Sequence, residues 1–301
     1  MTQAASMALE SIGGSRKADV HKHSMEIHFI LGGALVGFIV GATGVGGGSL
    51  MTPLLTLVFN VPAQVAVGTD LLFAAVTKAN GAWAHARRRN VDWAITGWLA
   101  AGSVPAALAT LATVREVGLD AKHFNTIVSH TLGGALLATA FALLLKEQVV
   151  ALGRRFAPAP QATLALAGAG APGVVALGAD GPVARPLPTL VVGALIGALV
   201  TLTSVGAGVI GVVALFFLYP QLASRRIVAS DIAHAVPLTL VAGLGHASLG
   251  TVNWSMLGSL LIGSLPAILL GASLAHRLPE RALRVFLAAM LVFLGSRLLY
   301  S

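Results

Sequence analysis

The segment 41–53 constrains this chain more than any other, because it places five glycines within eight residues between two strongly apolar runs. Irregular backbone is stable at membrane depth only where it lines a protected cavity, since lipid cannot hydrate its polar groups. Glycines leave successive N–H groups uncovered, and a helix that begins near Ser49 adds the positive end of its dipole. The segment therefore predicts a binding cradle for a small anion. The alternative is that the glycines only allow helices to pack closely.

The composition predicts a polytopic membrane protein, which we expect to be all-α and to lie in the inner (cytoplasmic) membrane. Hydrophobic residues make up 56% of the chain and charged residues 10%, and the mean hydropathy is +0.86, whereas an ordinary soluble domain is about a quarter charged. The net charge of +8 comes from arginines clustered beside apolar runs, which favours anchoring of cytoplasmic loops over nucleic-acid binding. The chain has no cysteine, which excludes disulfides and cysteine metal sites. No histidine spacing is typical of a metal site.

Five apolar runs in the first half of the chain are followed by five more in the second half. Most are long enough to span a bilayer, which takes about 20 apolar residues. The second run of each half is too short and pairs with its predecessor around a glycine break, so we expect each half to open with a glycine-broken, re-entrant hairpin. The runs are 27–43, 49–60, 63–86, 91–114, 123–146, 188–204, 207–219, 227–249, 253–276 and 281–300.

Identical residues recur at a constant spacing in the two halves, which indicates an internal duplication. The spacing is 160 residues through the glycine segment and 161 residues after it. Chance would rarely align identical Asp, His, Trp and Pro residues in this way. The pairs are Gly33/Gly193, Gly37/Gly197, Thr43/Thr203, Val45/Val205, Gly46/Gly206, Gly48/Gly208, Asp70/Asp231, Ala74/Ala235, His85/His246, Trp93/Trp254 and Pro105/Pro266.

The chain therefore divides into four parts. We expect a polar tail at 1–24, which lacks the features of a cleaved signal peptide, and a first transmembrane repeat at 25–146. A cytoplasmic linker rich in proline, glycine and alanine follows at 147–187, and the second transmembrane repeat occupies 188–301.

Basic residues predict that the two repeats are inverted, because cytoplasmic loops carry the excess of lysine and arginine. The arginines at 87–89 place their loop inside, whereas the loops 115–122 and 250–253 read as outside. The runs 63–86 and 227–249 then cross the membrane in opposite directions. Transporters with such inverted repeats place their site near the midplane, between the halves.

Ionisable residues inside the apolar runs are candidates for proton coupling or anion binding, since burying them costs roughly 2.5–3.5 kcal/mol on insertion scales. Asp70 and Asp231 either cap the first turn of a helix or couple to protons. Lys78 either contacts the anion or pairs with one of these aspartates. His234 shares a helix face with Asp231, which allows a proton relay or a structural hydrogen bond. His246 is either a gate or a buried, hydrogen-bonded ring.

The pattern Gly44-Val45-Gly46-Gly47-Gly48, then residues 66–71 and 90–93, with a degenerate copy at 205–208, resembles the sulfite exporter TauE/SafE family of membrane permeases. The resemblance covers about residues 27–300. It implies a secondary transporter, and more specifically an exporter, of a small sulfur-containing anion such as sulfite or an organosulfonate, acting by alternating access and driven by protons or by the membrane potential. Asp70 and Asp231 stand where many relatives carry a neutral serine, so the coupling mechanism is less transferable.

An anion channel of the same fold, or uptake instead of export, stays open as an alternative. No enzyme activity and no cofactor are expected, since the glycine run lacks the Gly-Lys-Ser/Thr ending of a phosphate-binding loop. The expected partners are the sulfur oxyanion or sulfonate, protons and lipid, and a homo-oligomer is left open. The candidate substrate-binding residues are Thr43, Gly46, Gly47, Gly48, Ser49, Lys78, Thr203, Ser204, Gly206 and Gly208.

Overall fold

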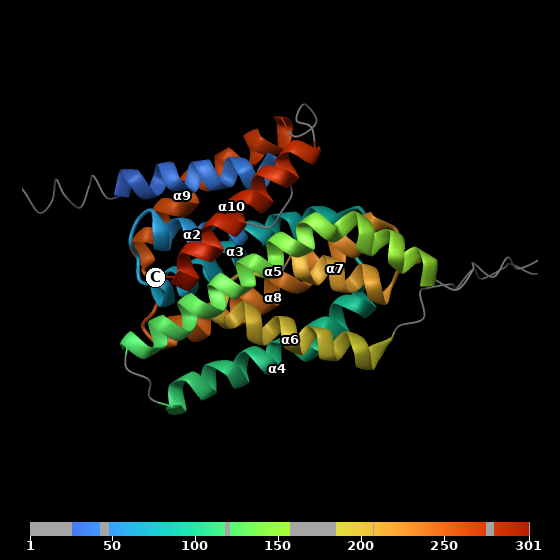
Figure 1. The fold of residues 1–301 in the computed structure, drawn as a ribbon, viewed down its shortest axis with the longest axis horizontal. Helices are drawn as coiled ribbons and strands as arrows, with labels where there is room; N and C mark the ends of the chain where they lie inside the picture. The colour runs from blue at the N-terminus through green and yellow to red at the C-terminus, as the bar shows by residue number, and fades with distance from the viewer. Residues whose placement is uncertain are drawn as a thin grey trace, which may run out of the picture.

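The structure, a computed structural model, describes residues 26–42, 48–117, 121–156, 185–206, 208–274 and 280–300. Within these ranges every regular element is a helix, and most helices lie along the long axis of the bundle (Figure 1). The helices are an N-terminal helix Glu26–Ala42, α2 (Gly48–Leu57), α3 (Ala63–Arg87), α4 (Trp93–Val117), α5 (Ala121–Phe156), α6 (Pro186–Thr203), α7 (Val209–Leu218), α8 (Ser224–Ser248), α9 (Trp254–Leu274) and α10 (Glu280–Tyr300).

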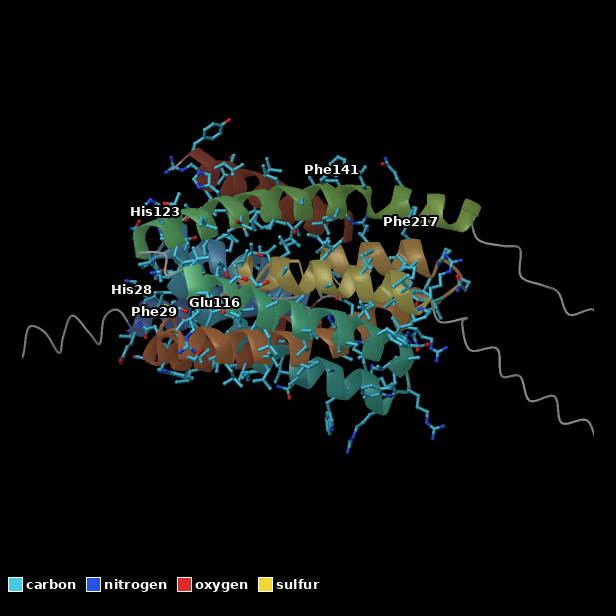
Figure 2. All side chains as sticks on the ribbon, turned by 90° about the horizontal axis from the view of Figure 1, so that it is seen from below. His28, Phe29, Glu116, His123, Phe141 and Phe217 are labelled. Atoms are coloured by element: carbon cyan, nitrogen blue, oxygen red, sulfur yellow. The ribbon has the colours of Figure 1, made fainter. Side chains whose placement is uncertain are left out.

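Five of the described helices are long and apolar enough to cross a membrane: α4, residues His123–Leu145 of α5, α6, α8 and α9. Large apolar side chains also cover the outside of the bundle, and Figure 2 shows Phe141 and Phe217 on its surface. Such a surface is stable against lipid and unfavourable against water. The chain is thus an all-α polytopic membrane protein, as predicted.

The described helices lie close to the predicted apolar runs. The apolar run 123–146 matches the candidate span His123–Leu145, and helix α5 continues beyond it to Phe156. The extension, 147–156, includes glutamate, glutamine, alanine, leucine and two arginines, which are good helix formers. Helix α6 begins at Pro186, where proline is favoured in the first turn.

Helices α2 and α7 are short, as predicted from their position after a glycine break. Each has 10 residues, about 15 Å at the helical rise per residue, whereas the hydrocarbon core is about 30 Å thick. The break before α7 is irregular: Ser204, Gly206 and Gly208 all have positive φ angles, of 57°, 114° and 141°. The corresponding break at 43–47 lies outside the described residues.

The two halves are interleaved through glycine-mediated helix contacts. A Cβ atom on Gly33 would collide with the carbonyl of Leu260, and one on Gly193 would collide with the carbonyl of Leu99. Both members of these contacts are related by the repeat spacing. The N-terminal helix therefore packs on α9, and α6 packs on α4 in the same way, at opposite sides of the bundle (Figure 1).

Hydrogen bonds between the halves are matched as well. The Thr69 hydroxyl accepts from the N–H of Asn253 at 3.1 Å, and the Ser230 hydroxyl accepts from the N–H of Asp92 at 2.9 Å. These two bonds exchange repeat partners, at the spacing of 161 residues. They fix α3 against the start of α9, and α8 against the start of α4. At the centre, α3 and α8 pack directly against each other.

Candidate functional site

A cluster of ionisable side chains lies buried where α3 and α8 meet. Asp70 and Lys78 come from α3, and Asp231 and His234 come from α8. Their exposed fractions are 0%, 8%, 1% and 0%, respectively. Charged groups are rarely buried to this degree without partners, because desolvation is costly. The partners of each group therefore decide what the cluster is able to do.

Asp70 is held by a hydroxyl from α2. The Thr52 hydroxyl donates to Oδ2 of Asp70 at 2.5 Å. The Ser204 hydroxyl, in the break after α6, lies near the same carboxylate but makes no hydrogen bond of good geometry. Oδ1 of Asp70 is buried and has no hydrogen-bond partner. Asp70 thus lies where α2, α3 and the second glycine break meet.

Asp231 lies against the first turn of α7. A Cβ atom on Gly211 would collide with Oδ1 of Asp231, so a side chain at this position would force the carboxylate to move. Oδ1 is buried and has no hydrogen-bond partner. The repeat-related carboxylates therefore both approach the short helix of their own half, Asp70 through a hydrogen bond from Thr52 and Asp231 through the contact of its Oδ1 with the backbone at Gly211.

Lys78 lies within electrostatic range of both carboxylates. It interacts electrostatically with Asp231 and with Asp70, and the interaction with Asp231 is the stronger one. It also acts on His234 across the helix interface. The structure thus brings Lys78 together with both aspartates named from the sequence. Contact between Lys78 and an anion stays a prediction.

The two buried histidines differ in how their ring nitrogens are used. His246 Nε2 donates to the carbonyl of Thr201, and Nδ1 lies 2.9 Å from the Thr251 hydroxyl. His246 is therefore a buried, hydrogen-bonded ring that ties α8 to α6. His234 Nε2 lies 2.8 Å from the Ser103 hydroxyl of α4, whereas Nδ1 is buried and has no partner.

The capping interpretation of the aspartates is wrong. Helix α3 begins at Ala63 after Pro62, and α8 begins at Ser224 after Ala223, so both aspartates lie well inside their helices. Capping is instead done by Asp92 and Asn253, whose side-chain oxygens accept from the N–H groups of Ile95 and Met256 at 3.3 Å and 3.0 Å.

The glycine cradles are described only in part. Thr43, Gly46 and Gly47 lie outside the described residues, as does the side chain of Ser49, and Gly48 begins α2. In the second cradle, the Thr203 hydroxyl bonds to backbone groups of Leu199 and Val205. The Thr203 hydroxyl therefore stabilises the break and already has hydrogen-bond partners in the backbone. The Ser204 hydroxyl is buried and without a partner, which leaves it available to a ligand.

Sequence reasoning missed three residues that shape the cluster: Thr52, Gly211 and Ser103. Thr52 was visible as a hydroxyl beside Pro53 in the glycine segment, but its partner Asp70 is 18 residues away. Gly211 and Ser103 carry no local signal, because their roles depend on which helices meet.

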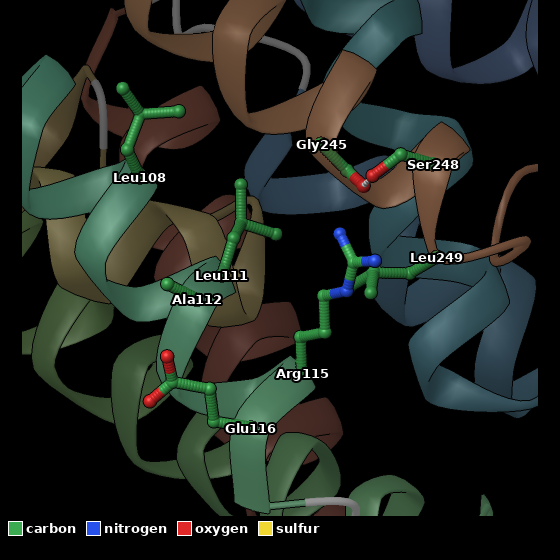
Figure 3. Close-up of a pocket in the computed structure, with 8 residues that line it drawn as sticks. All are labelled: Leu108, Leu111, Ala112, Arg115, Glu116, Gly245, Ser248 and Leu249. Atoms are coloured by element: carbon green, nitrogen blue, oxygen red, sulfur yellow. Dashed lines mark hydrogen bonds between the residues drawn. The ribbon is translucent and has the colours of Figure 1, made fainter.

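A separate hollow of about 570 Å³ lies between the ends of α4 and α8 (Figure 3). The Arg115 side chain points across it toward the end of α8. None of the clustered ionisable residues lines it. The lining residues are Leu108, Leu111, Ala112, Arg115, Glu116, Gly245, Ser248 and Leu249.

A multi-pass helical bundle with irregular backbone beside a buried ionisable cluster is the architecture of a membrane transporter. The comparison with known families agrees. The model of the Sulfite exporter TauE/SafE family matches residues 29–298, so the chain belongs to that family of membrane transporters, and the resemblance seen in the sequence is confirmed.

Curated relatives bear similar names. The chain is 32% identical over 275 residues to the probable membrane transporter protein YjnA of Bacillus subtilis (strain 168), which covers 91% of this chain and 100% of the relative. It is 25% identical over 254 residues to the probable membrane transporter protein YdhB of the same organism, covering 83% of this chain and 90% of the relative. No solved structure gives a significant match.

Proposed function

We propose that this membrane transporter is a secondary carrier that exports a small sulfur-containing anion, such as sulfite or an organosulfonate, across the cytoplasmic membrane by alternating access. The family description supports the substrate class. A carrier role, with no enzymatic step, fits a buried site whose groups bind and exchange protons.

The observation that carries the proposal is the position of Lys78. Its side chain is buried within electrostatic range of one carboxylate from each half, and the Ser204 hydroxyl is near one of them. The first turn of α7 adds the positive end of a helix dipole beside Asp231. An ammonium, a free hydroxyl and a helix N-terminus are together the groups that bind a small oxyanion.

Alternating access is supported by the matched contacts of the two halves. The N-terminal helix pairs with α9 and α6 pairs with α4, on opposite sides of the central α3 and α8. In the proposed mechanism these pairs rock in turn about the centre, as expected for inverted repeats. His28 lies at the same end of the bundle as Glu116 and His123 (Figure 2), which agrees with an N-terminus and an α4–α5 loop on the same, outer side.

The test is flux through purified protein in liposomes, screened across sulfite, thiosulfate, sulfate and short sulfonates. We expect saturable flux of sulfite or a sulfonate. Failure to move any of these anions would refute the proposed substrate class. Large unitary currents in a planar bilayer would identify a channel, and flux only from the outer to the inner side would identify an uptake carrier.

A further inference from the structure

The two carboxylates beside Lys78 are not equivalent. Asp70 receives a hydrogen bond from Thr52 and lies near the Ser204 hydroxyl. Asp231 has Lys78 as its electrostatic partner, and its Oδ1 faces the backbone at Gly211 without a donor. If the Lys78 ammonium binds another group, Asp70 still accepts the hydrogen bond from Thr52. Asp231 then carries a buried negative charge that Lys78 no longer balances, which is strongly unfavourable.

The charged and titratable groups around Asp231 can be named from each neighbouring element. Helix α3 contributes Lys78 and Asp70, and α8 itself contributes His234. Asp92 lies nearby, where its N–H donates to Ser230, but its carboxylate caps α4. The described residues of α6 and α7 contain no ionisable side chain near it. With the aspartates and the lysine ionised, the cluster carries one negative charge in excess.

We propose that the transported anion and the Asp231 carboxylate compete for the Lys78 ammonium, so that loading one monovalent anion places on Asp231 one proton from a hydronium ion of the adjoining solution, which is left as water. This inference rests on the proposed carrier function and deepens it. The anion takes over the hydrogen bonds of the ammonium, Lys78 stays protonated, and a new O–H bond forms on the released carboxylate. The buried charge is the same before and after loading, since one negative charge enters and one is neutralised.

This exchange also selects the substrate by charge. A monovalent anion, such as hydrogensulfite or a sulfonate, is compensated by the single proton on Asp231. A divalent anion, such as sulfate, leaves one additional buried negative charge. Transport of a monovalent anion with one proton is electroneutral, so the direction follows the anion gradient and the pH gradient. Export then occurs when the internal excess of the anion outweighs the inward proton gradient.

The test uses ethanesulfonate, which carries no titratable proton of its own, in liposomes that contain the full-length protein. For the parent, a pH gradient of one unit, acid outside, is expected to accumulate the sulfonate about tenfold, because one proton moves with each anion. A potassium diffusion potential set with valinomycin is expected to leave this ratio unchanged. Accumulation that follows the potential and ignores the pH gradient would overturn the proposal.

The decisive variant is Asp231→Asn, which mimics the protonated carboxyl group. It is expected to retain exchange of labelled for unlabelled sulfonate and to lose accumulation driven by the pH gradient. The matched control is the repeat partner, Asp70→Asn, which leaves Asp231 free to titrate and is expected to keep the tenfold ratio, even if its rate falls. Proton-driven accumulation by Asp231→Asn, or its loss in Asp70→Asn alone, would overturn the assignment.

Size-exclusion chromatography separates a folding defect from a loss of coupling. A monodisperse Asp231→Asn protein that fails to exchange would contradict the proposal, because the variant resembles the loaded state. If this variant does not fold, the response of the parent to pH and to potential decides alone. Flux of sulfonate without any pH response refutes the proton assignment but leaves the carrier function standing, whereas absence of flux of every sulfur anion refutes both.

Discussion

Replacing Lys78 by methionine tests the origin of anion affinity. Lys78→Met keeps the apolar length of the side chain and removes its charge. The exposed fraction of Lys78 is 8%, so water does not replace the lost ammonium. Truncating one partner of a desolvated charged contact typically costs about 2–5 kcal/mol. Since 1.4 kcal/mol corresponds to a tenfold change, even the lower value raises the dissociation constant roughly thirtyfold.

The assay is equilibrium binding of sulfite or ethanesulfonate to the purified protein, by calorimetry or by a scintillation proximity method. Lys78→Arg keeps the charge and is expected to weaken binding less than Lys78→Met. The matched control is the repeat partner, Thr239→Val. The Thr239 hydroxyl is buried but donates to the carbonyl of Ala235 in its own helix, so its removal is expected to leave anion affinity as in the parent.

A Lys78→Met protein that binds and transports like the parent would refute this reasoning. The anion would then be held by helix ends and by hydroxyls such as that of Ser204. Stability is a second readout. Breaking a buried ion pair costs about 3–5 kcal/mol when the remaining charge stays unpaired. We therefore expect Lys78→Met to unfold at a lower temperature than the parent, and the additional change Asp231→Asn to restore part of the loss.

Three further predictions concern the surroundings of the site. Gly211→Ala is expected to lower transport sharply, because its Cβ would collide with Asp231. The control is Gly258→Ala, at a position with open space. Equal transport by both variants would contradict the packing argument. Thr52→Val removes the donor to Asp70 and is expected to lower stability by about 1–3 kcal/mol, measured by thermal unfolding; an unchanged unfolding temperature would argue against that hydrogen bond. Single cysteines at Asn90 and Val252 are expected to react with impermeant reagents from opposite sides of the membrane, and labelling from the same side would rule out inverted repeats.

The internal duplication is a prediction from identical residues at a fixed spacing. The spacing that pairs Asp70 with Asp231 also relates Thr69 to Ser230 and Asp92 to Asn253, and these residues form the matched hydrogen bonds between the halves. The shortness of α2 and α7 was predictable too, since a glycine break limits the length of the apolar run that follows it.

The sequence left two roles open for Asp70 and Asp231, capping of a first turn and proton coupling. The helix starts at Ala63 and Ser224 exclude the capping role. The structure places Gly68 inside α3, where a Cβ would collide with the carbonyl of Thr251. Its glycine therefore serves close packing between elements that are far apart in the sequence. By the same reasoning, no local pattern distinguishes Gly193, which touches Leu99, from Gly97, which faces open space.

The difference between Lys78 and its repeat partner Thr239 explains why the proposed site would bind one anion and not two. Both halves have an aspartate at the same repeat position. Lys78, however, has Thr239 as its repeat partner, and the Thr239 hydroxyl donates to a carbonyl within its own helix. A lysine in both positions would place two ammonium groups between the same two carboxylates and leave them fully compensated. A single lysine leaves one carboxylate in excess, and Asp231, without a hydroxyl donor, is the group whose charge an arriving anion has to replace. In the proposed mechanism, this difference between the two halves is what makes the anion and the Asp231 carboxylate exclude each other.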